Sequence, residues 1–496
     1  MGVRVERASE GQSIRRVLDA LSEALAPQDA LHTVMALVLL RCEADREAAE
    51  EWEDGAQARE AWRALRQSGR WREGGNGLAE ALQQGLAHVL HRGLRSQEEN
   101  PRLRLDLPNL SGVRDHEAEL LVGWVARAED PKVLFDACLN QAQTLSKGGD
   151  YYTPQDVAHL FIALMEPAES EAVYDPVCGS GGFLLRAREY VAAQGGLADE
   201  PALYGQLADE PALYGQDASR LALLTAVLNF AVHKADVFLA GPASTLADDR
   251  FSDLTFDVVV ANPPFNQSGW DEHGFLREGL FWPYGLPPAG NANFAWAQHV
   301  LRKMTPTGRG ALLLPTGAAS TTKGAESHVR AALVDDDVLS GVVELPAGLI
   351  PHVRNPVSLW LFSKIKKPHR KWGHNDRSGQ LLVIDARDSA TNVKRGRRAV
   401  PEEARERIAA TFAAWRGAPG HAPYKDVPGW CRSLSRDEIA ETEYDVLPSH
   451  HVAAPLAPSV LPDAPERAAD LTDELLGLFE RSRRLEDELR DLLGEL

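Results

Sequence analysis

The chain has 496 residues, a formal net charge of −19 and 44% hydrophobic residues. This length predicts two or three domains, and the apolar content is sufficient for a large core. A protein that binds nucleic acid unaided usually carries an excess of Lys and Arg, so this acidic chain would need a local basic surface or a partner to do so.

The N-terminal stretch and the cysteines predict a cytoplasmic protein. The first residues are charged and lack a secretory signal, and the apolar run from Val34 to Leu40 is far too short to cross a membrane. The four cysteines are scattered, without the spacing of a metal site or a disulfide framework. We therefore expect no membrane contact and no bound metal.

Residues 1–140 are expected to form a helical domain, because apolar residues such as Leu31, Val34 and Val38 recur at helical spacing. A stripe of arginines follows at Arg59, Arg63, Arg66 and Arg70. On a helix these side chains share one face. It suits a solvated face paired with nearby acids, and the alternative is contact with a phosphate or a partner.

The segment Tyr151-Tyr152-Thr153-Pro154 precedes a predicted helix from Gln155 to Met165. Thr153 suits the N-cap of this helix and Pro154 its first turn. Free backbone N–H groups would then lie beside an aromatic pair. Taken alone this is an ordinary helix start, and a ligand-binding role depends on the motif that follows.

That motif runs from Val173 to Phe183. A short strand leads into the glycine turn Gly179-Ser180-Gly181-Gly182, and a helix is predicted after it. Glycines allow close backbone approach to a ligand, and a helix N-terminus favours a negative group. Asp175, just ahead of the turn, suits an ammonium group. A site for a carboxylate and an ammonium describes an amino-acid moiety.

A ten-residue segment, Leu197 to Gln206, is repeated residue for residue from Leu207 to Gln216. Two copies are too few for a repeat architecture, so we interpret them as a duplication within one loop. Only the second copy is followed by an acid, Asp217, and then by a predicted helix from Ala218 to His233. An acid at the end of a second strand is placed to bind ribose hydroxyls.

The apolar run Phe256 to Ala261 predicts a strand buried on both faces, and it ends at Asn262-Pro263-Pro264-Phe265. Ligands of open α/β sheets bind at the carboxyl ends of strands. The Asn262 amide oxygen and the Pro263 carbonyl could accept hydrogen bonds from a nucleobase amine and stabilise the charge that it develops as a nucleophile. Phe265 offers a face for stacking an extruded base. The alternative is a strand closed by a tight proline turn.

Further strands and helices alternate along the chain, which predicts a doubly wound α/β sheet. The expected strands are 235–240, 310–315, 339–345, 357–362 and 381–384, with a helix at 293–304. From Lys364 to Lys371 a basic segment suits either contact with DNA phosphates or a solvated linker.

The last residues carry the clearest periodicity. Its positions are Leu471, Leu475, Leu478, Ser482, Leu485, Leu489, Leu492 and Leu496, at alternating spacings of four and three. This heptad pattern predicts a helix that packs on another chain, or one that folds back on its own domain.

These motifs together resemble the N6-adenine DNA methyltransferases, in particular the modification subunit of type I restriction-modification systems. The family pattern has GGxFYTP, DPxCGSGGFL, an acid after a GQ pair, FDVVxANPPF, NADFAWxQH, LPxG and a closing EI-Y-LxP-YV segment. In this chain they are found at Gly148 to Pro154, Asp175 to Leu184, Gly215-Gln216-Asp217, Phe256 to Phe265, Asn291 to His299, Leu314 to Gly317, and Glu438 to Val452.

The resemblance implies a Rossmann-like methyltransferase fold with S-adenosylmethionine as cofactor. It implies a helical N-terminal domain at 1–140, a catalytic domain at 141–366, a small mixed segment at 367–464 and a C-terminal heptad helix at 465–496. The implied cofactor-binding residues are Tyr151, Tyr152, Thr153, Pro154, Gln155, Asp175, Gly179, Ser180, Gly181, Gly182 and Asp217, and the implied catalytic residues are Asn262, Pro263, Pro264 and Phe265.

The implied substrate is an adenine flipped out of double-stranded DNA, with methyl transfer in line and without a metal. The implied partners are a separate specificity subunit, which chooses the sequence and binds two copies of this chain, and a restriction subunit with nuclease and translocase activity. Two alternatives stay open. One is a methyltransferase acting on a protein glutamine amide, since such enzymes also use an Asn-Pro-Pro turn. The other is a non-catalytic scaffold in a defence complex.

Overall fold

The computed structural model describes the chain in segments separated by short gaps. The described residues are 14–19, 21–45, 53–66, 110, 113–145, 153–196, 211–271, 274, 282–322, 324–350, 353, 355–370, 372–393, 397–452, 472–473 and 475–485. The chain forms two compact units, Met1–Val452 and Ala453–Leu496. The functional division at residues 140, 366 and 464 stays a prediction.

The first unit contains helices before, between and after its strands. They are α2 (Pro27–Ala44), α3 (Glu53–Arg66), α5 (Asp115–Ala126), α6 (Pro131–Leu145), α7 (Gln155–Met165), α8 (Gly182–Val191), η3 (Ala192–Gly196), α9 (Arg220–Val232), α10 (Asn293–Lys303), η7 (Thr316–Ala319), α11 (Gly324–Asp335), α12 (Glu402–Arg416), α13 (Arg436–Glu441) and α14 (Pro448–His451).

The strands form one large sheet and one hairpin. They are β1 (Ala172–Asp175), β2 (Ala212–Gln216), β3 (Phe238–Ala240), β4 (Phe256–Ala261), β5 (Met304–Pro315), β6 (Leu339–Leu345), β7 (Val357–Ser363), β8 (Gln380–Asp385), β9 (Thr391–Val393), β10 (Arg397–Ala399) and β11 (Cys431–Ser435).

The large sheet has the strand order β11-β8-β6-β7-β5-β4-β1-β2-β3, and β9 pairs with β10. Neighbouring strands from β5 through β4, β1 and β2 to β3 are parallel. Strand β7 runs antiparallel between β5 and β6, and β11 runs antiparallel to β8. The carboxyl ends of β1 to β4 therefore lie at one edge of the sheet.

Each face of the sheet packs into its own hydrophobic core. Along β4, Val258 and Val260 belong to one core, while Val259 and Ala261 belong to the other. Successive side chains of a strand point to opposite faces, so a strand covered by helices on both sides must be apolar throughout. Helices α7, α8, α9 and α12 contribute to the first core, and α10 and α11 to the second. The predicted doubly wound fold is confirmed.

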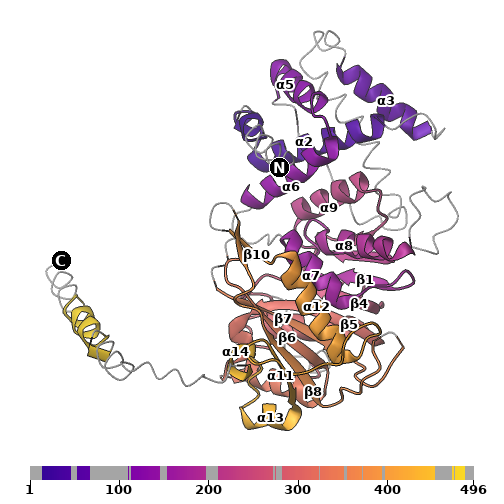
Figure 1. The fold of residues 1–496 in the computed structure, drawn as a ribbon. Coiled ribbons are helices and arrows are strands. Elements are labelled where there is room, and N and C mark those ends of the chain that lie inside the picture. The colour runs from indigo at the N-terminus through magenta and orange to yellow at the C-terminus, as the bar shows by residue number, and fades with distance from the viewer. Residues whose placement is uncertain are drawn as a thin grey trace. The chain divides into compact units, whose positions relative to one another are not determined.

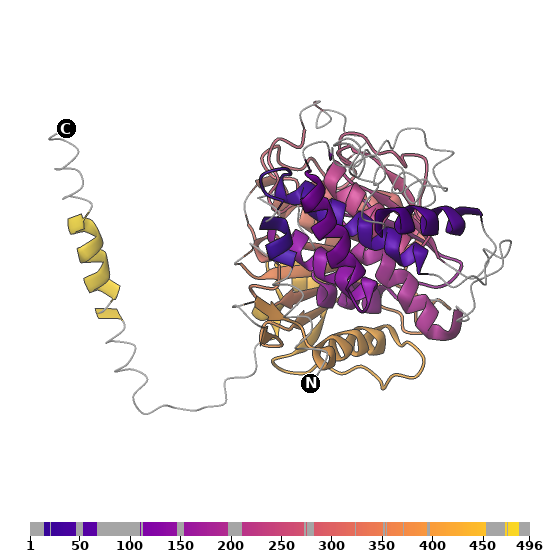
Figure 2. The same ribbon diagram turned by 90° about the horizontal axis from the view of Figure 1, so that it is seen from above.

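The N-terminal helices pack on one another and on the sheet domain. Helix α2 contacts α3, α5, α6 and α9, and Figure 1 shows this group on the side of the unit where α9 and α8 lie. In Figure 2 the same indigo and purple helices lie over the magenta helices. Helix α2 is buried along almost its whole length, so it is an interior element and not a surface helix.

Most predicted elements are confirmed, and the helix 155–165 and the strands 256–261 and 339–345 coincide with α7, β4 and β6. Strand β2 lies in the second copy of the repeated segment, whereas the first copy lies outside the described residues. Strand β5 begins earlier than predicted, at Met304.

The basic segment that begins at Lys364 is neither a solvated linker nor a surface for DNA at Lys366. The Lys366 ammonium is buried, donates to the carbonyls of Leu339 and Gln380, and pairs with Asp337. Both interpretations are wrong for Lys366, because composition does not reveal that strands β6 and β8 lie beside the residue that follows β7. Lys364 is exposed and donates to the Met304 carbonyl, and for this residue the two interpretations stay predictions.

A buried guanidinium joins β5 to the chain ahead of β1. Arg309 pairs with Glu171 at 2.7 and 2.9 Å and donates to the carbonyls of Met165 and Glu166. The two side chains are 7% and 2% exposed. Because the Met165 and Glu166 carbonyls end helix α7, this one cation fixes a helix end and joins β5 to the chain ahead of β1, although β4 lies between these two strands.

We predict that Arg309→Met destabilises the protein strongly, because it leaves the Glu171 carboxylate buried without its cation. The expected loss is about 3–5 kcal/mol in the free energy of unfolding, measured by denaturant titration. The control is Arg186→Met, which removes an ion pair with Glu189 that lies nearer the surface, and its expected cost is below about 1 kcal/mol. Equal losses in the two variants would contradict the role of the buried pair.

Candidate functional site

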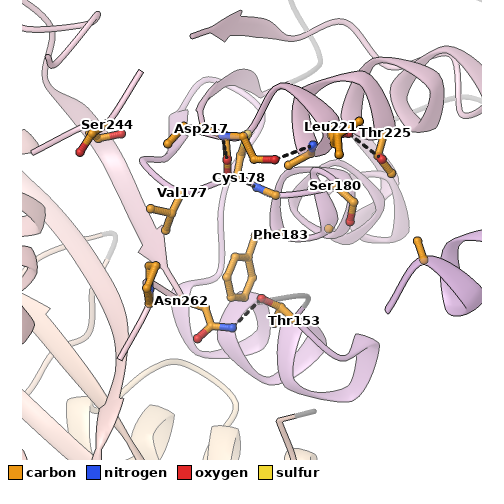
Figure 3. A pocket seen from close by; sticks show the side chains of 18 of the residues that line it. Thr153, Val177, Cys178, Ser180, Phe183, Asp217, Leu221, Thr225, Ser244 and Asn262 are labelled. Carbon is orange, nitrogen blue, oxygen red and sulfur yellow. Dashed lines mark hydrogen bonds between the residues drawn. The ribbon is translucent and has the colours of Figure 1, made fainter. Parts of the chain in front are cut away.

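A cavity of about 200 Å³ lies at the carboxyl ends of the parallel strands. Its walls include residues from the loops that follow these strands: Val177 after β1, Asp217 after β2, Ser244 after β3 and Asn262 after β4. Figure 3 shows these side chains around the cavity, with Phe183 between the glycine turn and Asn262. This is the edge at which open α/β sheets bind ligands.

The glycine turn is held by the Asp217 carboxylate. One oxygen accepts a hydrogen bond from the Gly179 amide and the other from the Ser219 amide, each at 2.8 Å. Each carboxylate oxygen can accept more than one hydrogen bond. Asp217 therefore joins the loop after β1 to the loop after β2 at the cavity wall.

Gly181 is needed in this turn for two reasons. Its φ of +81° lies in the left-handed region, and a Cβ at this position would come within 2.5 Å of the Phe230 ring. The turn therefore fits closely against helix α9. At the neighbouring Gly182 the φ is ordinary and an added Cβ would meet no atom within 4 Å.

The Asn262 amide is buried and oriented. Its nitrogen donates to the Thr153 hydroxyl at 3.0 Å, and its side chain is 4% exposed. Among the described residues its oxygen Oδ1 has no hydrogen-bond partner. An unpaired buried carbonyl costs free energy that a ligand donor can recover.

The prediction that Thr153 caps α7 was wrong. Pro154 holds the cap position and no side chain caps the helix, because the Thr153 hydroxyl faces Asn262.

The loop after the Asn-Pro-Pro-Phe turn is fastened to helix α10 by a pair of amides. The Asn266 backbone N–H donates to Asn293 Oδ1 at 3.0 Å, and Asn293 Nδ2 donates to Asn266 Oδ1 at 2.9 Å. Asn266 itself has a left-handed φ of 51°. The backbone direction after Phe265 is therefore set by two reciprocal hydrogen bonds, which accounts for the two asparagines.

Asp175 is 1% exposed, and its carboxylate accepts a hydrogen bond from the Val177 amide at 3.0 Å. Burial, together with the nearby Asp217 carboxylate, raises the pKa of Asp175 well above its usual range. The side chain supports the backbone of the turn. Its predicted contact with an ammonium group stays a prediction.

The predicted site residues fall into three groups. Those that line the cavity are Thr153, Gly179, Ser180, Gly182, Asp217, Asn262 and Pro264. Those that adjoin it without lining it are Pro154, Gln155, Asp175, Gly181, Pro263 and Phe265. Tyr151 and Tyr152 lie outside the described residues.

The sequence analysis missed wall residues that come from helices. Helix α9 contributes Leu221, Ala222 and Thr225, helix α10 contributes Trp296, and the N-terminal helices contribute Gln28, Leu31, His32 and Ala142. Trp296 belongs to a motif that was recognised but given no role. The others sit in ordinary apolar helix patterns, so no local signal distinguished them.

Two further observations concern metal sites and membrane-spanning helices. Within the described segments, no cluster of His, Cys, Asp and Glu side chains is arranged to hold a metal ion. No helix among the described residues is both long and apolar enough to span a membrane.

Residues 136–457 match the model of the N-6 DNA methylase family. The chain belongs to this family. It is 31% identical over 351 residues to the type I restriction enzyme HindI methylase subunit of Haemophilus influenzae, covering 71% of this chain and 74% of that protein. It is 28% identical to the MjaIX methylase subunit of Methanocaldococcus jannaschii, covering 70% of this chain and 60% of that protein. The chain is thus a type I methylase subunit, of the adenine-specific DNA methyltransferase class, as the motifs predicted.

Solved structures support the fold. The type I methyltransferase subunit from Streptococcus thermophilus superposes with a TM-score of 0.63 at 20% identity, covering 90% of this chain and 99% of that one. A chain from a type I restriction-modification complex gives a TM-score of 0.59 at 19% identity, covering 98% and 99%. The predicted Rossmann-like methyltransferase architecture is therefore confirmed.

We predict that replacing each of the adjacent glycines Gly181 and Gly182 by Ala has opposite effects on the free energy of unfolding. Gly181→Ala should lower the free energy of unfolding by at least about 1–3 kcal/mol, because Ala must adopt a left-handed φ against the Phe230 ring. Gly182→Ala, at the first residue of α8, should leave stability unchanged or raise it by up to about 1 kcal/mol. Thermal unfolding of both variants measures this, and a stable Gly181→Ala protein would show that the turn is not held closely against α9.

Proposed function

We propose that this chain transfers a methyl group from S-adenosylmethionine to N6 of an adenine flipped out of double-stranded DNA. The observation that carries the proposal is the buried, unpaired Oδ1 of Asn262 in the wall of a cavity whose other wall is the glycine turn and Asp217. An acceptor for an amine thus lies across one cavity from a carboxylate and a backbone turn. We expect the protein to act in the cytoplasm.

The cavity residues fit the parts of this cofactor. Asp217 can accept hydrogen bonds from the ribose hydroxyls, and the glycine turn, with Thr153 close by, admits the methionine end. The apolar atoms of Leu221 and Ala222 suit a ring system. The cofactor, when bound, supplies an electrophilic methyl group on a sulfonium.

The chain's part in the reaction is to position and polarise the adenine amine. Asn262 Oδ1 and the Pro263 carbonyl accept hydrogen bonds from its two N–H groups. This favours a more tetrahedral nitrogen and stabilises the positive charge that develops there. The Thr153 hydroxyl fixes the amide orientation through Nδ2. The Phe265 ring, half-buried beside the turn, suits stacking against the flipped base.

A separate specificity subunit is the proposed partner that selects the DNA sequence. In the second unit residues 472–473 and 475–485 are helical. The seam residues Leu475, Leu478 and Leu485 are 51%, 50% and 59% exposed, while Leu471, Leu489, Leu492 and Leu496 lie outside the described residues. A helix with an exposed apolar seam suits pairing with helices of another chain. We propose two copies of this chain per specificity subunit, and a restriction subunit in systems that also cut DNA.

The overall test is labelled methyl transfer by the full-length chain co-expressed with its specificity subunit. Label from S-adenosylmethionine should appear in DNA as N6-methyladenine. Label in a protein glutamine would favour the protein methyltransferase, and cofactor binding without any transfer would favour the non-catalytic scaffold.

We predict that Asn262→Ala lowers methyl transfer at least 100-fold, the scale for removing one preorganised charge-stabilising group, while cofactor affinity changes only a few fold. The matched variant Thr153→Val retains the Asn262 amide but removes the hydroxyl that orients it. Methyl transfer should therefore fall less in Thr153→Val than in Asn262→Ala. Transfer assays and isothermal titration measure the two quantities. A folded Asn262→Ala protein that no longer binds the cofactor would place Asn262 at the wrong end of the site.

We also predict that Leu478→Glu with Leu485→Glu prevents assembly with the specificity subunit and leaves cofactor binding intact. Each buried Leu contributes roughly 1.5–3 kcal/mol, and a buried carboxylate adds a further cost. The control is Glu480→Gln, on the opposite face of the same helix. Size-exclusion chromatography of the co-expressed proteins reports assembly, and co-elution of the double variant would rule out the seam as the interface.

A further inference from the structure

Helix α2 forms part of the cavity although it lies far from the cofactor motifs in the sequence. It spans Pro27–Ala44, outside residues 136–457 that match the family model. Gln28, Leu31 and His32 nevertheless line the same cavity as Asp217 and Asn262. One wall of the site is therefore built by the N-terminal helices.

This wall is fixed in place by packing and by one buried hydrogen bond. Leu31 is 2% exposed and His32 is 5% exposed. His32 Nε2 lies 2.8 Å from the Thr225 hydroxyl oxygen on α9. Thr225 also lines the cavity, and Figure 3 shows it beside Leu221, on the helix that follows Asp217. The contact joins the N-terminal helices to helix α9, which follows the proposed ribose-binding acid Asp217 in the chain.

The hydrogen atoms of this contact determine the state of the imidazole. The Thr225 hydroxyl donates its single hydrogen to the Leu221 carbonyl at 2.9 Å. We assign the tautomer that agrees with this donation, in which Nε2 carries the proton and donates to Thr225, and Nδ1 has a lone pair. Among the described residues, Nδ1 has no hydrogen-bond partner, and it is shielded from solvent.

The ring is also neutral. Burial lowers the pKa of His32 to about 4, and the Asp29 carboxylate and the Leu221 and Gln28 carbonyls offset this only in part. A neutral imidazole does not repel a cationic ligand. A buried acceptor without a donor is costly, and a ligand N–H or O–H would recover that cost.

We propose that α2 belongs to the cofactor site and that His32 Nδ1 accepts a hydrogen bond from an N–H or O–H group of S-adenosylmethionine, with Leu31 and Gln28 closing the cavity over it. The inference rests on the proposed function, which names the occupant. The cofactor offers three kinds of donor: the adenine amino group, the ribose hydroxyls and the methionyl ammonium. Cofactor binding then also strengthens the docking of α2 on α9, because the bound cofactor bridges both helices.

Two substitutions separate the ligand contact from the structural contact. In His32→Asn the amide oxygen can occupy the place of Nδ1, while the link to Thr225 is lost. In His32→Gln the amide can reach the place of Nε2 and keep that link, while the acceptor at Nδ1 is lost. The third variant, Val38→Ala, disturbs the buried packing of α2 at a residue that does not line the cavity.

Isothermal titration of the full-length chain with S-adenosylmethionine measures the effect. We expect His32→Gln to weaken binding about tenfold or more, and His32→Asn to stay within a few fold of the wild type although its melting temperature falls further. Val38→Ala should lower the melting temperature without changing the dissociation constant. Wild-type affinity in His32→Gln, or the reverse order of the two His32 variants, would overturn the proposal and leave His32 as a structural link.

Titration with a second ligand identifies which donor group of S-adenosylmethionine contacts His32. If the loss in His32→Gln persists with 5′-methylthioadenosine, which lacks the amino-acid part, His32 contacts the adenosine. If the loss occurs only with S-adenosylmethionine, His32 contacts the ammonium. Failure of the proposed function would look different, because the wild type itself would then bind neither ligand.

Discussion

The shared carboxyl edge of the parallel strands β4, β1, β2 and β3 is the constraint on which the rest of the site depends. Parallel neighbours end on the same side, so loops far apart in the chain must meet there. The Asp217 carboxylate then joins two of these loops through the amides of Gly179 and Ser219. Together with the hydrogen bond from Asn229 Nδ2 to the Ser180 carbonyl and the packing of Gly181 against Phe230, this pairing fixes the position of the glycine turn at the cavity wall.

The polar groups at this edge are of two kinds. Asp175 and the Asn266–Asn293 pair are satisfied within the protein and hold backbone segments in place. Asn262 Oδ1 and His32 Nδ1 are buried, and each lacks a partner among the described residues. Groups of the first kind stabilise the fold. Groups of the second kind cost free energy until a ligand donates a hydrogen bond to them, so they are the candidates for contact with a ligand.

The helices do more than cover the two faces of the sheet. Buried cations such as Arg309 and Lys366 bind carbonyls at element ends and so join segments distant in sequence. Helix α2 reaches the cavity itself. The packing of the N-terminal helices therefore also determines the shape of the cavity.

The sequence by itself determined most strands of the sheet, the glycine turn, Asp217 and the Asn-Pro-Pro-Phe turn, because each depends on local patterns: apolar runs, glycines and prolines at fixed offsets, and an acid after a strand. It did not predict the short strands β9, β10 and β11. Only the tertiary structure decided that Thr153 faces Asn262 instead of capping α7, that Lys366 is buried, and that His32 lies at the cavity. Each of these outcomes depends on which distant element packs beside the residue. That information is absent from local spacing, because a hydroxyl, a lysine or a helical histidine has the same local pattern whether its neighbour is water, a carbonyl or a cofactor.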